Sequence, residues 1–386
     1  MSSSQDPKSP KSPKSSGGKA ASPEPTPAPP TIVALSVEES REAGILPGAH
    51  WTEQPVNLSI SASRVAQRLN EVDDDGASTI GSVASTTASL SSSIFEYRTI
   101  HGRTYHADIG NAESWEPNDQ HHIDSMEISH HTLMVSLDGK LFLSPLDKKK
   151  IHKVLDIGTG TGLWAVDFAY EFPNAEVIGT DITPIQPAWV PANVKFELDD
   201  CNSEWSWAEN SVDFIHLRIM MGVVTDWHSL FRNAFRCARP GGYVESMVSS
   251  AYFQSDDGSV KEGSALEQWH NIFWEAGKKL GRSFRVIEDD LQIRAMEAAG
   301  FVDVTVKNIK VPFGIWPEDK RLSELGLWWK MALEADLEGY LNYVCNVMLG
   351  WTTEQTAAYC AHVRKEWADT NIHSWVWLRV VYGRKP

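Results

Sequence analysis

The chain has 386 residues, of which 42% are hydrophobic, and a formal net charge of −16 at pH 7. This length permits two ordinary domains, or one large domain with disordered segments, and the apolar fraction is sufficient for a real core. The acidic balance argues against a general attraction to nucleic acid or anionic membranes, so we expect neither as a partner.

No apolar run approaches the roughly 18–20 residues that span a bilayer. The polar N-terminus, "MSSSQDPKSPKSPKSSGG", lacks the apolar segment of a secretory signal. The four cysteines are widely spread and form no C-x-x-C pair, which favours a reducing compartment over a disulfide framework. We therefore expect a cytoplasmic or nuclear protein that is not secreted.

Two low-complexity stretches precede the first regular pattern. Residues 1–31 consist mainly of Ser, Pro, Lys and Ala, and residues 73–93 read "DDDGASTIGSVASTTASLSSS". Neither can bury enough apolar surface to offset an ordering entropy of roughly 1–2 kcal/mol per residue. We predict a disordered region over residues 1–94, with order beginning near Phe95 and a single domain over residues 95–386.

The ordered part begins with strands that alternate with helices. The apolar patterns predict helices at residues 123–143, 163–172 and 227–238, and strands at residues 153–157, 175–180, 194–198, 212–217 and 243–248. This alternation is typical of a parallel α/β sheet with helices on its faces.

The C-terminal third is mostly helical. Helices are predicted at residues 266–280 and 288–299, followed by a strand at 302–311 and an apolar, Trp-rich segment at 322–349. Gly350 ends that segment, and a capping box from Thr352 to Gln355 opens another helix. A final strand is expected at residues 375–382.

A glycine-rich turn joins the first predicted strand of the sheet to its helix. The stretch "VLDIGTGTGLWAVDFA" (residues 154–169) carries Gly158, Gly160 and Gly162 at alternate positions. Glycine permits close approach of a ligand to the backbone and a positive φ. Two ligand classes use such a turn: dinucleotides, whose G-x-G-x-x-G/A pattern is also matched here, and S-adenosylmethionine, with D/E-x-G-x-G-x-G.

Acidic residues at successive strand ends favour S-adenosylmethionine. Asp156 precedes the first glycine, where it would repel a pyrophosphate and attract a sulfonium or ammonium group. Asp181 ends the second strand and can accept both ribose hydroxyls, a feature that NAD enzymes share. Asp200 follows the third strand and suits the adenine amine, with the Cys201 N–H for a ring nitrogen; Asp199 is a competing adenine ligand.

Together with "RPGGYVE" (residues 239–245) before the fifth strand, these features predict a complete cofactor site. Its predicted residues are Asp156, Gly158, Thr159, Gly160, Gly162, Asp181, Ile182, Asp199, Asp200, Cys201 and Arg218. Arg218 has two open roles, which are to hold the methionine carboxylate or to hold a loop.

The candidate catalytic residue is His216, which ends the fourth strand in "HLR". Its ordinary pKa of about 6.5 suits a general base. A structural role, with the ring stacked near the cofactor, is the open alternative. We expect no metal site, because the histidine pairs His121–His122 and His130–His131 lack known ligand spacings and methyl transfer needs no metal.

At this point the chain resembles the class I S-adenosylmethionine-dependent methyltransferases. More narrowly, it resembles the fungal LaeA-like methyltransferases, which are associated with velvet-type regulators and secondary metabolism. The narrower resemblance covers residues 97–386 and rests on "HGRTYH", "LDGKLFLSPL", "TPIQPAWVP", "IHLR" and "VPFGIWPEDKRLSELG". It departs at His121–His122, where relatives tend to carry a charged pair, and at residues 246–248, where they often have Gln-Glu.

The resemblance implies a Rossmann-like fold with a mainly parallel seven-stranded sheet, an antiparallel last strand and a helical C-terminal insertion at residues 322–370 that caps the substrate. Two functions follow from it. One is methyl transfer from S-adenosylmethionine to a small-molecule acceptor in fungal secondary metabolism. The other is a regulatory methyltransferase that acts with velvet-type partners.

Overall fold

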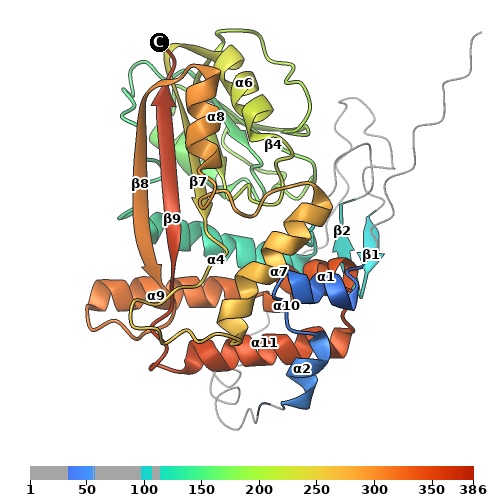
Figure 1. Ribbon diagram of the computed structural model, residues 1–386. Helices are drawn as coiled ribbons and strands as arrows, with labels where there is room; N and C mark the ends of the chain where they lie inside the picture. The colour runs from blue at the N-terminus through green and yellow to red at the C-terminus, as the bar shows by residue number, and fades with distance from the viewer. Residues whose placement is uncertain (1–33, 55, 57–96, 107–113) are drawn as a thin grey trace, which may run out of the picture. The chain divides into compact units, whose positions relative to one another are not determined.

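The structure is a computed structural model that describes residues 34–54, 56, 97–106 and 114–386. Most of the predicted disordered region, and the predicted start of order near Phe95, lie outside the described residues. The described part contains a seven-stranded sheet with helices around it, together with a small β-hairpin, as Figure 1 shows.

The sheet has the strand order β5-β4-β3-β6-β7-β9-β8. Its strands are β3 Lys153–Ile157, β4 Glu176–Asp181, β5 Val194–Leu198, β6 Val212–Arg218, β7 Ala238–Ser249, β8 Val302–Pro312 and β9 Trp375–Arg384. The first five run parallel, whereas β9 is antiparallel to both β7 and β8. This confirms the predicted seven-stranded, mainly parallel sheet with an antiparallel last strand.

The central strands are near-continuous apolar runs because helices cover both faces of the sheet. The helices of this layer are α5 Leu163–Glu171, α6 Trp227–Cys237 and α8 Leu291–Ala299. Each packs an apolar stripe on the strands, and α6 buries Leu230, Phe231 and Ala234.

A second group of helices lies beyond the carboxyl end of β7 in Figure 1. It consists of α4 Gln120–Ser136, α7 Ala265–Leu280, α9 Lys320–Glu334, α10 Leu337–Leu341, the π-helix η2 Asn342–Met348 and α11 Thr353–Ala368. Helices α9 to α11 form the connection between β8 and β9. The helix predicted at residues 123–143 ends seven residues earlier than expected, because a turn at Asp138–Gly139 has positive φ.

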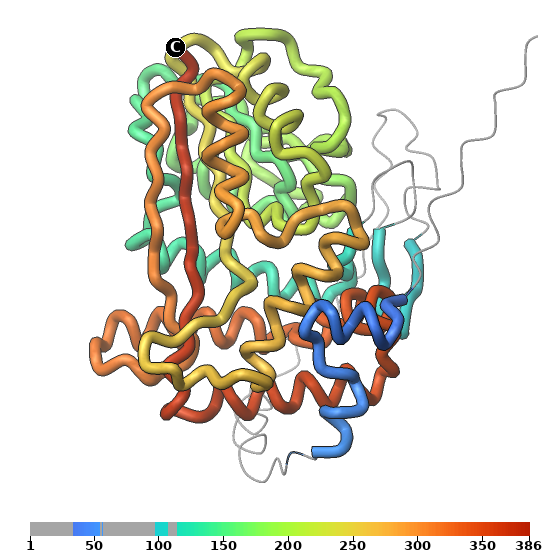
Figure 2. The backbone as a smooth tube through the Cα atoms, viewed as in Figure 1, coloured from blue at the N-terminus to red at the C-terminus, as the bar shows by residue number. Residues whose placement is uncertain are grey.

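The prediction of disorder over residues 1–94 is wrong for residues 34–54. These form α1 Val37–Glu42 and α2 Gly48–Glu53, and Figure 2 shows α2 beside α11. Trp51 of α2 is buried against the rings of Tyr359 and His362. A few apolar side chains between the two low-complexity stretches are therefore enough to pack residues 34–54 against α11.

The described helices include none that is both long enough and apolar enough to cross a membrane.

Candidate active site

The glycine turn between β3 and α5 has a left-handed backbone conformation that glycine adopts much more readily than other residues do. Gly158, Gly160 and Gly162 have φ of +67°, +57° and +79°. A Cβ at Gly162 would lie 2.3 Å from the ring of Phe196. The turn is therefore shaped both by backbone conformation and by the close approach of β5.

Asp181 ties this turn to the end of β4. One carboxylate oxygen accepts a hydrogen bond from the Gly160 N–H at 2.8 Å, and the other accepts from the Thr183 N–H at 3.0 Å. Burial raises the pKa of Asp181. Each oxygen retains a further lone pair, so the carboxylate can still accept hydroxyl donors of a ligand.

A cavity of about 250 Å³ opens at this edge of the sheet. Nine of the predicted cofactor residues line it: Gly158, Thr159, Gly160, Asp181, Ile182, Asp199, Asp200, Cys201 and Arg218. The rest of the lining combines aliphatic and hydroxyl side chains with a group of large aromatic side chains: Trp115, Phe253, Trp269, Phe273, Phe313, Trp329 and Tyr340. The cavity thus has a polar half at the glycine turn and an aromatic half beneath the second group of helices.

Asp156 and Gly162 are predicted cofactor residues that do not line the cavity. Asp156 is buried behind the turn, where it accepts a hydrogen bond from the Thr159 hydroxyl at 2.6 Å and another from His216 Nδ1 at 2.8 Å. Its carboxylate therefore holds the turn in place from within the protein, and the predicted direct contact with a ligand is corrected.

The prediction of His216 as a catalytic base is also corrected. Its side chain is 0% exposed, does not line the cavity and stacks on Trp164 with ring centroids 3.7 Å apart. Burial lowers the pKa of His216, although the hydrogen bond to Asp156 opposes the change. A general base must reach the proton that it removes, so the structural alternative fits this residue.

Arg218 lines the cavity and belongs to a chain of hydrogen bonds that crosses to α4. Its Nη1 donates to Nδ1 of His130 at 3.0 Å, and Nε2 of His130 bonds to Asp167 at 2.9 Å. Since a guanidinium only donates, Nδ1 of His130 is the acceptor and its proton is on Nε2. Arg218 is thereby oriented by His130 of α4, which Asp167 of α5 holds in turn.

The sequence interpretation missed the contribution of α4. His122, Met126 and His130 are spaced four residues apart, so they share one helical face, and all three line the cavity. Met126 contacts the glycine turn: a Cβ at Gly160 would lie 2.5 Å from its methyl carbon. This four-residue spacing is the signal that could have identified the face.

The polar half fits S-adenosylmethionine. The cavity lining holds four carboxyl groups (Glu116, Asp181, Asp199 and Asp200) and a single guanidinium, that of Arg218. Burial raises the pKa of Asp199 as well as that of Asp181. An acidic site of this kind disfavours a pyrophosphate and suits a cationic nucleoside with hydroxyl and amino donors.

Comparison with known proteins agrees with this chemistry. A methyltransferase-domain family matches residues 129–306. The methyltransferase pytC of Aspergillus terreus is 35% identical over 317 residues, covering 82% of this chain and 96% of that protein. The secondary metabolism regulator LAE1 of Cochliobolus heterostrophus is 30% identical over 292 residues, covering 74% and 94%.

Among solved structures, phosphoethanolamine N-methyltransferase 2 of Haemonchus contortus in complex with S-adenosyl-L-methionine shares 18% identity, with a TM-score of 0.39. The match covers 68% of this chain and 52% of that chain. The family match, the two relatives and the acidic glycine-turn site together show that the chain belongs to the S-adenosylmethionine-dependent methyltransferases, in the group that includes the LaeA-like proteins.

Proposed function

We propose that the protein transfers a methyl group from S-adenosylmethionine to a small, largely apolar molecule in fungal secondary metabolism. The observation that carries the proposal is the continuity of the cavity, which joins the acidic glycine-turn half to a half walled by aromatic side chains. Enclosed apolar pockets with a few polar groups are the usual form of small-molecule sites.

The connection between β8 and β9 forms part of the aromatic half. It contributes Trp329, Ala332, Leu333 and Tyr340 to the lining. We infer that this connection is the predicted substrate-capping insertion. Trp115 offers a polar contact within the apolar wall, because its buried indole N–H has no hydrogen-bond partner among the described residues. An oxygen of the acceptor would satisfy that donor.

In this proposal S-adenosylmethionine supplies an electrophilic methyl group. Asp181 accepts ribose hydroxyls, Asp199 or Asp200 accepts the adenine amine, and Arg218 binds the methionine carboxylate. The chain otherwise contributes alignment of the acceptor and exclusion of water, and such positioning supplies several kcal/mol of barrier lowering.

The regulatory alternative is a protein that acts with velvet-type partners. It is supported by the 30% identity to a secondary metabolism regulator and by Trp189, which is 84% exposed in the segment "TPIQPAWVP". An exposed aromatic side chain of this kind is a candidate anchor for a partner protein.

The deciding experiment supplies methyl-tritiated S-adenosylmethionine and the purified protein to an extract from cells that lack it. The extract is separated beforehand into small-molecule and protein fractions. Label in the small-molecule fraction supports the proposal, whereas label confined to protein supports the regulatory alternative.

A matched pair of variants on α9 links the transfer to the cavity. Trp329→Ala alters the aromatic wall and should lower transfer while leaving the affinity for S-adenosylhomocysteine unchanged. Leu327→Ala, at a position that is 41% exposed on the same helix, should change neither quantity.

A further inference from the structure

A buried histidine–aspartate pair lies at the aromatic half of the cavity. Nδ1 of His122, near the start of α4, is 2.8 Å from Oδ2 of Asp336, which caps α10. His122 is 1% exposed and Asp336 is fully buried. Because an ionised carboxylate only accepts hydrogen bonds, His122 donates its Nδ1 proton to Asp336.

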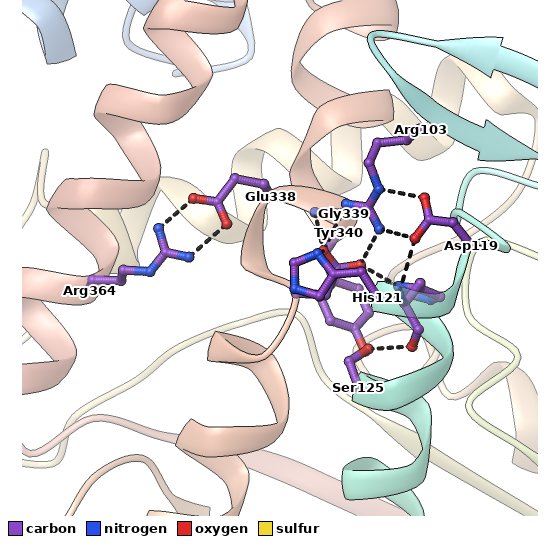
Figure 3. Close-up of polar contacts among 10 residues, drawn as sticks. Arg103, Asp119, His121, Ser125, Glu338, Gly339, Tyr340 and Arg364 are labelled. Atoms are coloured by element: carbon purple, nitrogen blue, oxygen red, sulfur yellow. Dashed lines mark hydrogen bonds and ion pairs between the residues drawn. The ribbon is translucent and has the colours of Figure 1, made fainter. Parts of the chain in front are cut away.

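Arg103 of the hairpin strand β2 (Arg103–Tyr105) holds Asp336 from its other side. It donates to both carboxylate oxygens of Asp336 at 2.8 Å, and it also pairs with Asp119 at 2.6 Å and 2.7 Å. Figure 3 shows Arg103 with Asp119 beside the start of α4. Two carboxylates thus share one guanidinium.

The cluster of Arg103, Asp119, Asp336 and His122 carries one net negative charge while His122 is neutral. Protonation of His122 brings that charge to zero. Burial by itself would raise the pKa of Asp336, but the hydrogen bonds from His122 and Arg103 outweigh burial and lower that pKa to about 2. His121 also approaches Asp336, at 3.6 Å, from a largely exposed position.

His122 is placed to contact a molecule in the cavity. It lines the cavity together with Tyr340, whose ring lies 5.1 Å from its own. Among the described residues, no side chain or backbone group hydrogen-bonds to Nε2 of His122. Met126, which contacts the glycine turn, lies four residues further along α4, or about 6 Å along the helix axis.

We propose that His122 is the general base of this methyltransferase and that the group it deprotonates is a hydroxyl of the acceptor. The inference rests on the proposed small-molecule function and names the acceptor's reacting group. Asp336 acts through His122, as a positioning residue that fixes the tautomer and stabilises the imidazolium.

In this step the acceptor O–H bond breaks and its proton passes to Nε2 of His122. The oxygen bonds to the methyl group as the methyl–sulfur bond breaks, and the electron pair of that bond stays on sulfur. One positive charge is consumed at sulfur and one appears on His122, so the charges balance. The product is a methyl ether and the imidazolium returns its proton to solvent after release.

A hydroxyl suits this arrangement better than an amine does. A neutral amine attacks through its lone pair, whereas a hydroxyl becomes a strong nucleophile only as its proton leaves. Burial raises the pKa of Tyr340 to about 12, so this phenol stays neutral beside His122. Its hydroxyl lies 3.4 Å from that of Ser125, which in turn donates to the His122 carbonyl.

The first test compares His122→Ala, His122→Gln and the control His131→Gln, which changes an exposed histidine on the same helix. Transfer to the labelled small-molecule fraction should fall about 10²- to 10⁴-fold in both His122 variants. The control should match the wild type, and all four proteins should bind S-adenosylhomocysteine alike. Free imidazole should restore part of the transfer in His122→Ala, and none in His122→Gln, whose side chain fills the space.

The second test needs no turnover. With S-adenosylhomocysteine present, 4-nitrophenol is added below the pH at which the free probe ionises, and the visible absorbance of its phenolate is recorded. The wild type and the exposed-position control His131→Gln, which should both behave alike, serve as comparators for His122→Gln and Asp336→Asn. In the wild type, the bound probe should contain a larger phenolate fraction than the free probe does at the same pH. This increase should be absent in both His122→Gln and Asp336→Asn.

The outcomes separate the two proposals. Label that reaches only protein overturns the proposed function and this inference with it. Label in small molecules, with His122→Ala as active as the wild type or with the methyl bound to carbon or nitrogen, overturns this inference alone. Equal phenolate fractions in the wild type and His122→Gln also overturn it.

Discussion

Asp156 and His216 occupy paired positions on the neighbouring strands β3 and β6, and their side chains are joined by a hydrogen bond of 2.8 Å. Asp156 also holds Thr159 of the glycine turn, and His216 stacks on Trp164 of α5. This pair therefore connects two strands, the turn and the following helix behind the cavity. Because neither residue lines the cavity, the pair supports the structure of the site and does not contact the acceptor.

The first prediction follows for His216→Phe, which keeps a ring against Trp164 and removes the donor to Asp156. We expect a loss of about 1.5–3 kcal/mol in the free energy of unfolding, because a buried carboxylate loses a hydrogen bond. The rate at saturating S-adenosylmethionine should change little. Denaturant unfolding and initial rates measure the two effects, with the exposed His228→Phe as control. A large loss of rate at unchanged stability would restore the catalytic role.

The second prediction concerns Asp181. Asp181→Ala should weaken binding of S-adenosylhomocysteine by about 10- to 150-fold, since hydrogen bonds to a charged group contribute about 1.5–3 kcal/mol. It should also lower the melting temperature, because Gly160 and Thr183 lose their acceptor. Asp181→Asn keeps one acceptor oxygen and should be milder in both respects.

Calorimetry and thermal unfolding of the apo protein separate these two contributions for Asp181. Glu197→Ala, on the neighbouring strand β5 and outside the cavity lining, is the matched control. An unchanged affinity with a lowered melting temperature would mean that Asp181 serves the turn alone.

The glycine turn and the acidic strand ends could be predicted from the sequence because local patterns determine them. Glycines at alternate positions after an apolar strand define the turn, and the carboxyl ends of β4 and β5 bring Asp181, Asp199 and Asp200 to the cavity. Asp156 near the end of β3 is the exception, because its side chain turns inward to His216. The role of His216 could not be read in the same way. Its place at a strand end was evident, but the stacking on Trp164 that buries it depends on how α5 packs.

The contact between His122 and Asp336 could not be predicted from the sequence, for a different reason. The two residues are 214 positions apart, and their contact depends on how the connection between β8 and β9 folds back over α4. The docking of α1 and α2 is likewise a tertiary effect, since six-residue helices are too short to be stable alone. For both the His122–Asp336 contact and the docking of α1 and α2, the local sequence pattern does not indicate which distant residues are contacted.

The third prediction concerns these docked helices. A protein that begins at residue 34 should unfold at the same temperature as the full chain, because it keeps the contacts of α1 and α2. A protein that begins at residue 56 should unfold at a lower temperature, since Trp51 no longer covers the fully buried Tyr359. Differential scanning calorimetry compares the two truncations. Equal melting temperatures for both would show that the docking contributes nothing to stability.

The fourth prediction concerns pH and Glu245 of β7. This buried carboxyl group accepts hydrogen bonds from the N–H groups of Leu143 and Ser144 and from the Ser144 hydroxyl, yet burial raises its pKa from 4.5 to about 7. The folded protein therefore holds this proton more tightly than the unfolded chain does. The contribution of Glu245 to stability is greatest below pH 4.5, falls as the pH rises to about 7 and is constant above that.

The loss between these two pH values corresponds to on the order of 3 kcal/mol. Glu245→Gln cannot ionise and should remove this slope. The measurement is the free energy of unfolding of the wild type minus that of the variant at several values between pH 5 and pH 8, so that all other titrating groups cancel. The exposed Glu262→Gln should leave the slope intact. A difference that stays constant between pH 5 and pH 8 would mean that Glu245 is already ionised in the folded protein at pH 5 and that its hydrogen bonds to the segment before β3 outweigh its burial.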